Sequence, residues 1–165
     1  MPGKQPLPPK KERTCGPCAE CCTAMGIAEI GKKAGERCAH LVPRANGGEH
    51  CGIYETRPNS CRTFVCYFLK GWATAAERPD KLGVVIAPTL YGAKIPSVYA
   101  LESRPNALTR LTTALRLAEL EANVAVYHVP LGEDATRTLR GPRHLVQKIQ
   151  QLAELALFQE IEKMS

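Results

Sequence analysis

Eight cysteines lie within the first 66 residues of this 165-residue chain, and none follows them. Thiols this dense are normally bridged as disulfides or bound to metal, because unpaired exposed cysteines oxidise. A Cys-x2-Cys turn can aim two sulfurs at one ion, about 2.3 Å from each, and this spacing occurs twice here. We therefore predict thiolate-bound zinc, with iron or an iron–sulfur cluster as the alternative. The predicted metal ligands are Cys15, Cys18, Cys21, Cys22, Cys38, Cys51, Cys61 and Cys66.

The adjacent pair Cys21-Cys22 is an awkward arrangement for a single tetrahedral ion. In a helix the two side chains would point about 100° apart. The doublet therefore indicates more than one metal ion, a bridging thiolate, or one cysteine kept in the core. Eight thiols would be enough for two four-thiolate sites, but the spacing alone does not say which cysteines share an ion.

Two motifs of redox proteins begin in this cluster but lack the context that they need. Cys15-Gly-Pro-Cys18 has thioredoxin-type spacing, yet the polar segment before it is not the strand of a βαβ unit. The bacterial ferredoxin run also begins at Cys15, but it breaks at the cysteine doublet. A thioredoxin fold is therefore not expected, whereas an iron–sulfur cluster with ligands from distant parts of the chain stays open.

Two histidines and two arginines accompany the cysteines. His40 follows Cys38 by two residues, and His50 directly precedes the next cysteine, so either could replace a sulfur ligand. A loop histidine near a metal more often forms a hydrogen bond or faces solvent. The same choice holds for Arg57 and Arg62, which either offset thiolate charge or are solvated. No pair of histidines has the spacing of a Cys2His2 zinc finger.

The disulfide alternative requires an oxidising compartment. The first 14 residues are polar, cationic and rich in proline, without the apolar stretch of a signal peptide. No apolar run in the sequence approaches the roughly 18–20 residues of a membrane helix. We therefore expect a cytoplasmic protein without membrane contact, in which reduced thiols bind metal.

The formal charge of +6 is a weak indication of nucleic-acid binding. Half of it comes from the first 14 residues, which hold four basic residues and one acidic residue. Thiolate ligation would reduce the remainder, because four thiolates outweigh the charge of one divalent ion. Metal ions are the expected partners, a protein partner stays unidentified, and nucleic acid is not favoured.

The elements that must position the thiols differ between the two halves of the chain. Residues 1–14 are predicted to be a disordered tail. Residues 15–72, the predicted metal-binding module, contain few large apolar side chains and are not expected to fold unaided. Residues 73–165 have ordinary α+β patterning and are predicted to form a scaffold that makes one compact unit with the module.

Periodicity predicts the elements of this scaffold. Strands are expected over 83–87, 97–101 and 123–129, where apolar residues alternate or run together. Helices are expected over about 107–122 and 142–163. The predicted fold is α+β, with a small metal-stapled subdomain packed on a short antiparallel or mixed sheet with two helices. The residues expected to face the core are Leu108, Leu111, Leu115, Ala118 and Ala122 in the first helix, and Leu145, Ile149, Leu152, Ala156 and Phe158 or Ile161 in the second.

The order of the cysteines resembles the bacterial YkgJ-type cysteine-cluster family, a zinc- or iron-chelating domain. The similarity covers about residues 15–72. It includes Cys-x2-Cys-x2-Cys-Cys, a later cysteine, and the run Cys51-x-Ile-Tyr-x2-Arg57-Pro58-x2-Cys61-Arg-x-Phe-x-Cys66. The resemblance implies metal-ligand roles for all eight cysteines, without dividing them between ions.

Outside the cluster the sequence contains no catalytic motif: no phosphate loop, no Gly-x-Ser-x-Gly elbow and no His-Glu-x-x-His helix. An enzyme would have to work through the metal. We therefore favour a non-enzymatic protein with structural thiolate–metal sites. The alternatives are an iron or iron–sulfur protein with a redox or iron-handling role, and an adaptor that uses metal knuckles to bind RNA or a protein.

Overall fold

The computed structural model describes residues 13–89, 92, 94–132 and 135–164. Within these residues the chain has helices, a two-stranded sheet and a four-stranded sheet, which confirms the predicted α+β class. Most of the predicted tail lies outside the described residues. The α-helices and strands are α1 Cys21–Ala24, β1 Leu41–Pro43, β2 Glu49–Cys51, α2 Asn59–Thr63, α3 Pro79–Leu82, β3 Val84–Pro88, β4 Ser97–Glu102, α4 Leu111–Glu121, β5 Ala125–Val129, β6 Thr138–Arg140 and α5 Arg143–Met164.

The four-stranded sheet runs in the order β3-β4-β5-β6. β3 and β4 are antiparallel, β4 and β5 are parallel, and β5 and β6 are antiparallel. The parallel pair requires a crossover, which α4 provides between β4 and β5. The three predicted strands correspond to β3, β4 and β5. Their runs of valine, isoleucine and alanine reflect a sheet that is covered on both faces.

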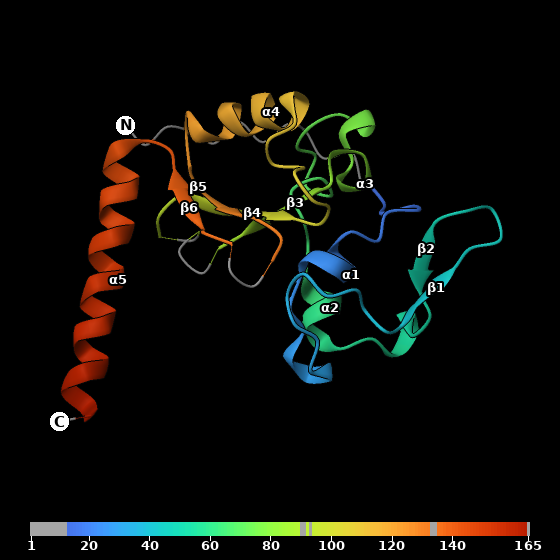
Figure 1. The fold of residues 1–165 in the computed structure, drawn as a ribbon, viewed down its shortest axis with the longest axis horizontal. Coiled ribbons are helices and arrows are strands. Elements are labelled where there is room, and N and C mark those ends of the chain that lie inside the picture. The colour runs from blue at the N-terminus through green and yellow to red at the C-terminus, as the bar shows by residue number, and fades with distance from the viewer. Residues whose placement is uncertain (1–12, 90–91, 93, 133–134, 165) are drawn as a thin grey trace.

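α4 covers one face of this sheet (Figure 1). Alternate strand residues such as Val84, Val98 and Val126 pack there against Leu117 of the helix. Every second residue of a strand points to the same face, so these positions form a continuous apolar layer. The helix thereby buries the centre of the sheet.

The rotation of α4 differs from the prediction, since Leu111 and Leu115 are 75% and 59% exposed and Ala118 and Ala122 also face solvent. Leu108 is buried as expected, but it lies in the loop before the helix. Its backbone N–H donates to the buried carboxylate of Glu102 at 3.0 Å. The loop therefore fills the core position that the helix was expected to fill. The helix presents Thr113 and Leu117 to the sheet instead, both at most 2% exposed.

The opposite face of the sheet is shared by two elements. At the β3 and β4 side, Val85 and Leu101 pack with Ala24, Cys66 and Phe68 from the cysteine-rich part of the chain. At the β5 and β6 side, α5 packs through its first turns. Figure 1 shows α5 leaving the sheet at the end away from α1 and α2.

α5 is buried over less of its length than predicted. Leu145 and Ile149 pack on the sheet as expected, whereas Leu152 is 38% exposed and Ala156 faces solvent. The predicted inward position of Phe158 or Ile161 lies outside the described side chains. β6 is a short edge strand of three residues, so no sheet surface continues beneath the rest of the helix. The helix therefore projects beyond the body of the protein (Figure 1).

Truncating an apolar side chain should destabilise the protein in the packed part of α5 but not in its projecting part. Ile149 is 1% exposed, so Ile149→Ala should reduce the free energy of unfolding by about 3 kcal/mol through lost burial and a cavity. Leu155 is 58% exposed, so the matched Leu155→Ala change should stay within about 0.5 kcal/mol of the wild type. Urea unfolding followed by circular dichroism measures both. Equal losses for the two variants would contradict this division of the helix.

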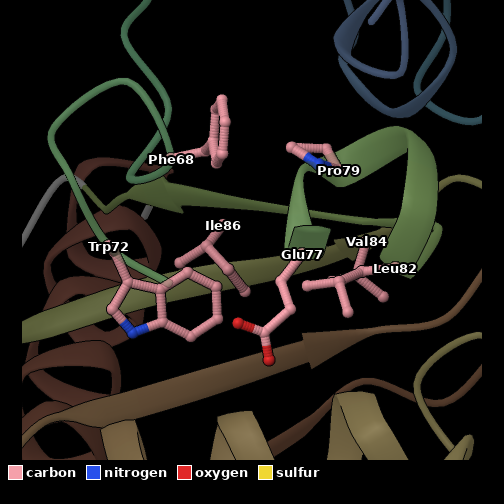
Figure 2. Close-up of a pocket in the computed structure, with 7 residues that line it drawn as sticks. All are labelled: Phe68, Trp72, Glu77, Pro79, Leu82, Val84 and Ile86. Carbon is pink, nitrogen blue, oxygen red and sulfur yellow. The ribbon is translucent and has the colours of Figure 1, made fainter. Parts of the chain in front are cut away.

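The segment from Trp72 to Leu82, which ends with α3, packs on the sheet. Figure 2 shows side chains of this segment and of β3 around a recess. The recess leaves no room for a water molecule. Glu77 lies at its wall and forms an ion pair with Arg116 of α4. The hydrogen bond from Arg116 lowers the pKa of Glu77 to about 2. We therefore interpret the recess as interior packing rather than as a ligand site.

The helices also bear on the predicted lack of membrane contact. Among the residues that the structure describes, none of the helices combines the length and the apolar character needed to cross a lipid bilayer.

Candidate metal centre

All eight cysteines lie in residues 15–66, which we call the cysteine lobe, and all are free thiols. Its helices and strands are short, three to five residues each. Turns and loops therefore position most of the thiols. Cys38 and Cys66 are buried, Cys15 is exposed, and the others are half-buried.

A turn and one short helix position the first four cysteines. The backbone N–H of Cys18 donates to the Cys15 carbonyl at 2.9 Å, which closes the turn before α1. Cys21 and Cys22 then begin α1 itself. The side chains of this doublet share a hydrogen bond, which raises the pKa of Cys21 and lowers the pKa of Cys22 to about 7. Cys22 is therefore the more readily ionised thiol of the pair.

Backbone contacts draw the β1–β2 hairpin towards the doublet. The N–H of Cys38 donates to the Cys22 carbonyl at 3.0 Å, and the N–H of Leu41 donates to the Cys38 carbonyl at 3.2 Å. Leu41 is in turn the cross-strand partner of Cys51. Cysteines that are 29 positions apart in the sequence are thus linked through one short chain of contacts. No periodic pattern in the sequence predicts these long-range contacts.

Cys61 joins the same neighbourhood from α2. Glu29 accepts hydrogen bonds from the backbone N–H and the hydroxyl of Ser60, at 3.0 and 2.6 Å, and so ties the start of α2 to the preceding loop. Partial burial raises the pKa of Cys61, and the nearby thiols of Cys22, Cys51 and Cys38 raise it further. Three thiols from other segments of the lobe therefore lie close enough to act on Cys61.

The other end of the lobe rests on the sheet. Cys66 is 8% exposed and packs with Ala24 of α1 and Val85 of β3. Its thiol lies within electrostatic reach of Cys15. Burial raises the pKa of Cys18 to about 11. These thiols are held under and beside α1, and the guanidinium of Arg44 in the hairpin loop donates to the Gly16 carbonyl of their turn at 3.1 Å.

No coordination sphere is formed by these side chains. Among residues 13–89, 92, 94–132 and 135–164, no group of three or more cysteine, histidine, aspartate or glutamate side chains is arranged to hold a metal ion. The chemistry of the donors nevertheless suits zinc and iron, because thiolates are soft ligands for both. The predicted metal ligation therefore remains a prediction, and the contacts above show only which thiols are neighbours.

Lys32 is a feature of the lobe that sequence reasoning missed. It is only 9% exposed, and its ammonium donates to the carbonyl oxygens of Thr23 and Lys33 at 3.1 Å each, and to that of Met25. Burial lowers the pKa of Lys32, and the thiols of Cys38 and Cys22 act in the opposite direction. A buried cation thus lies beside the cluster. In the sequence nothing distinguishes it from the exposed lysine that follows.

Arg57 and Arg62 have different roles in the structure. Arg62 donates to the carbonyls of Glu55 and Arg57, at 2.6 and 2.9 Å, and so shapes the loop before α2. Arg57 stacks over the ring of Tyr54, with 3.6 Å between its Cζ and the ring centroid. Its charge also reaches the thiol of Cys15. The effect on Cys15 fits the predicted role of Arg57 in offsetting thiolate charge.

The two histidines are placed differently. His50 is exposed on β2, and it precedes Cys51 in an extended strand, so the two side chains lie on opposite faces of the hairpin. This placement disfavours His50 as a ligand to the ion that would use Cys51. His40 is half-buried, and its carbonyl accepts the N–H of Gly52 at 2.8 Å. For His40, both a role as a metal ligand and a role as a hydrogen-bonding residue stay open.

Arg13 anchors the beginning of the lobe. Its guanidinium donates to the carbonyls of Trp72 and Ala73 at 3.0 and 2.7 Å and lies over the ring of Phe68. The N-terminal turn is thereby held against the segment that leads into the sheet. Arg13 was predicted to lie in the disordered tail, and this engagement leaves it poorly placed to contact a nucleic-acid phosphate.

Comparisons with known proteins do not place this chain in a family. No family model, no curated protein and no solved structure matches the sequence. The resemblance to the YkgJ-type family therefore stays a prediction that rests on the cysteine motif alone.

Proposed function

We propose that this protein binds zinc, or alternatively iron, through its cysteine thiolates, and that the bound metal holds the cysteine lobe together. One observation carries the proposal: eight free thiols are gathered in a lobe whose longest helix has five residues. Such short elements bury too little apolar surface to be stable alone. Thiolate-bound zinc contributes about 10–16 kcal/mol in small domains, which would make up the difference.

A structural role follows more directly from this arrangement than an enzymatic one. A site closed by four thiolates leaves no coordination position for water or a substrate, whereas catalytic zinc sites keep one open. We therefore propose a non-enzymatic protein, with residues 15–72 as the metal-binding module and the rest as its scaffold. A reducing compartment such as the cytoplasm suits this function, because thiols there stay available for metal. The cysteine motif supports a place in the YkgJ-type family.

The experiment that tests this proposal is elemental mass spectrometry of untagged protein purified without oxygen. We expect about two zinc ions per chain and no visible absorption, as eight thiolates can fill two tetrahedral sites. Iron with absorption in the visible would support the redox or iron-handling alternative instead. A chain that carries no metal after loading with zinc, and whose eight thiols all react with a thiol reagent under native conditions, would refute metal binding.

A further inference from the structure

On the premise of the proposed metal binding, we infer that the eight thiols form two separate four-thiolate sites that divide between the adjacent residues Cys21 and Cys22. The hairpin site contains Cys22, Cys38, Cys51 and Cys61. The N-terminal site contains Cys15, Cys18, Cys21 and Cys66.

The hairpin site follows from backbone geometry. Cys22 and Cys38 are joined by a backbone hydrogen bond of 3.0 Å. The Cys38 carbonyl is bound by Leu41, which faces Cys51 across the hairpin. The hydrogen bonds from Ser60 to Glu29 tie the start of α2, and with it Cys61, to the loop between Cys22 and Cys38. The thiols of Cys22, Cys51 and Cys38 also act electrostatically on Cys61. Backbone contacts thus bring these four residues into one part of the lobe.

The N-terminal site follows from the turn and from α1. Cys15 and Cys18 are joined by a backbone hydrogen bond of 2.9 Å. Cys21 follows Cys18 by three positions at the start of α1, and both Cys15 and Cys18 influence its thiol. The fourth member is Cys66, which is packed beneath α1 and is the strongest thiol neighbour of Cys15. No other cysteine is left for this group.

Each group also has its own counter-charge. Four thiolates around a divalent ion leave a net charge of about −2. The ammonium of Lys32 lies beside the hairpin group, where Cys38 and Cys22 are its strongest thiol neighbours. The guanidinium of Arg78 lies beside the N-terminal turn, 3.5 Å from the position that a Cβ on Gly16 would take, and it also pairs with the carboxylate of Asp80. Separate cations for the two groups fit two separate anionic sites.

The two groups meet at the doublet, where the Cys21 and Cys22 side chains share a hydrogen bond. Cys22 also lies within reach of Cys15. A single cluster with bridging thiolates is therefore the competing arrangement. It differs from two sites in a measurable way, because the loss of one bridging thiolate would loosen both groups together.

The test compares Cys21→Ser with Cys22→Ser in zinc-loaded protein under anaerobic conditions. Native mass spectrometry counts zinc, and a brief alkylation pulse followed by peptide mapping identifies the exposed thiols. We expect each variant to keep about one zinc instead of two. Cys21→Ser should expose Cys15, Cys18 and Cys66, and Cys22→Ser should expose Cys38, Cys51 and Cys61.

The same pulse on wild-type protein during stepwise removal of zinc keeps the inference testable if a variant fails to fold. Half-metallated molecules should carry four labels, all within one group. Labels that mix the two groups, or the loss of both zinc ions in either variant, would overturn the division into two sites. These outcomes differ from failure of the proposed function, in which the wild-type chain itself retains no metal.

Discussion

Removal of bound metal is expected to unfold the cysteine lobe while the centre of the four-stranded sheet stays folded. The lobe relies on helices and strands of three to five residues, so the loss of about 10–16 kcal/mol of metal binding exceeds what its few buried side chains can replace. The sheet keeps α4 on one face and the first turns of α5 on the other. Hydrogen exchange with mass spectrometry, with and without an excess of chelator under reducing conditions, measures both parts.

Peptides that cover residues 15–66 should lose their protection, and β4 and β5 serve as internal references. β3 is expected to loosen in part, because Val85 loses its cover from Ala24 and Phe68. Adding zinc back should restore protection, whereas magnesium should not, since it prefers oxygen ligands. Unchanged exchange in residues 15–66 after complete removal of metal would show that the lobe is stable by itself.

The strands and helices of the scaffold could be predicted because each has a strong local pattern. The apolar runs at 83–87 and 97–101 correspond to β3 and β4, and the helical spacing in the last part of the chain corresponds to α5. β6 was missed, since Thr138-Leu139-Arg140 is a short edge strand without an apolar run. It pairs antiparallel with β5, and three residues carry no pattern that indicates this pairing.

The rotation of α4 could not be predicted from periodicity. Leucines occur on both candidate faces of this helix, at 111 and 115 on one and at 117 and 120 on the other. The buried carboxylate of Glu102, at the end of β4, binds the N–H of Leu108 and that of Leu131, at 3.0 and 2.9 Å. These bonds hold the loop before the helix in the core, and such contacts between distant residues are not contained in the local pattern.

The arrangement of the candidate metal centre also could not be predicted from local sequence patterns. The sequence predicts which thiols are available, but loop contacts between distant residues, such as the bond from Cys38 to Cys22, determine which of them are neighbours. Long-range closure of this kind has no spacing rule in the sequence. The buried ammonium of Lys32 is invisible for the same reason, because its partners are backbone carbonyls.

Lys32→Met is expected to be the most destabilising single change in the loop between Cys22 and Cys38. Methionine keeps the apolar part of the side chain but cannot donate, so all three carbonyls lose the bond from the ammonium. The carbonyls of Thr23 and Lys33 keep backbone donors at 3.0 and 3.4 Å, whereas the carbonyl of Met25 loses a buried donor. A buried acceptor left without a hydrogen bond costs about 1–3 kcal/mol. We therefore expect the free energy of unfolding to fall by about 2 kcal/mol, measured by urea unfolding of the zinc-loaded protein.

The matched control is Lys148→Met on the exposed surface of α5, which should change stability by less than about 0.5 kcal/mol. The two variants lose the same charge from the chain, so the overall charge cannot explain a difference between them. Zinc release to a competing chelator should also be faster in Lys32→Met, because the positive charge beside Cys22 and Cys38 is lost. Equal stability of the two variants would mean that the carbonyls around Lys32 are satisfied without it. The order of this loop would then have to come from the thiolate ligands alone.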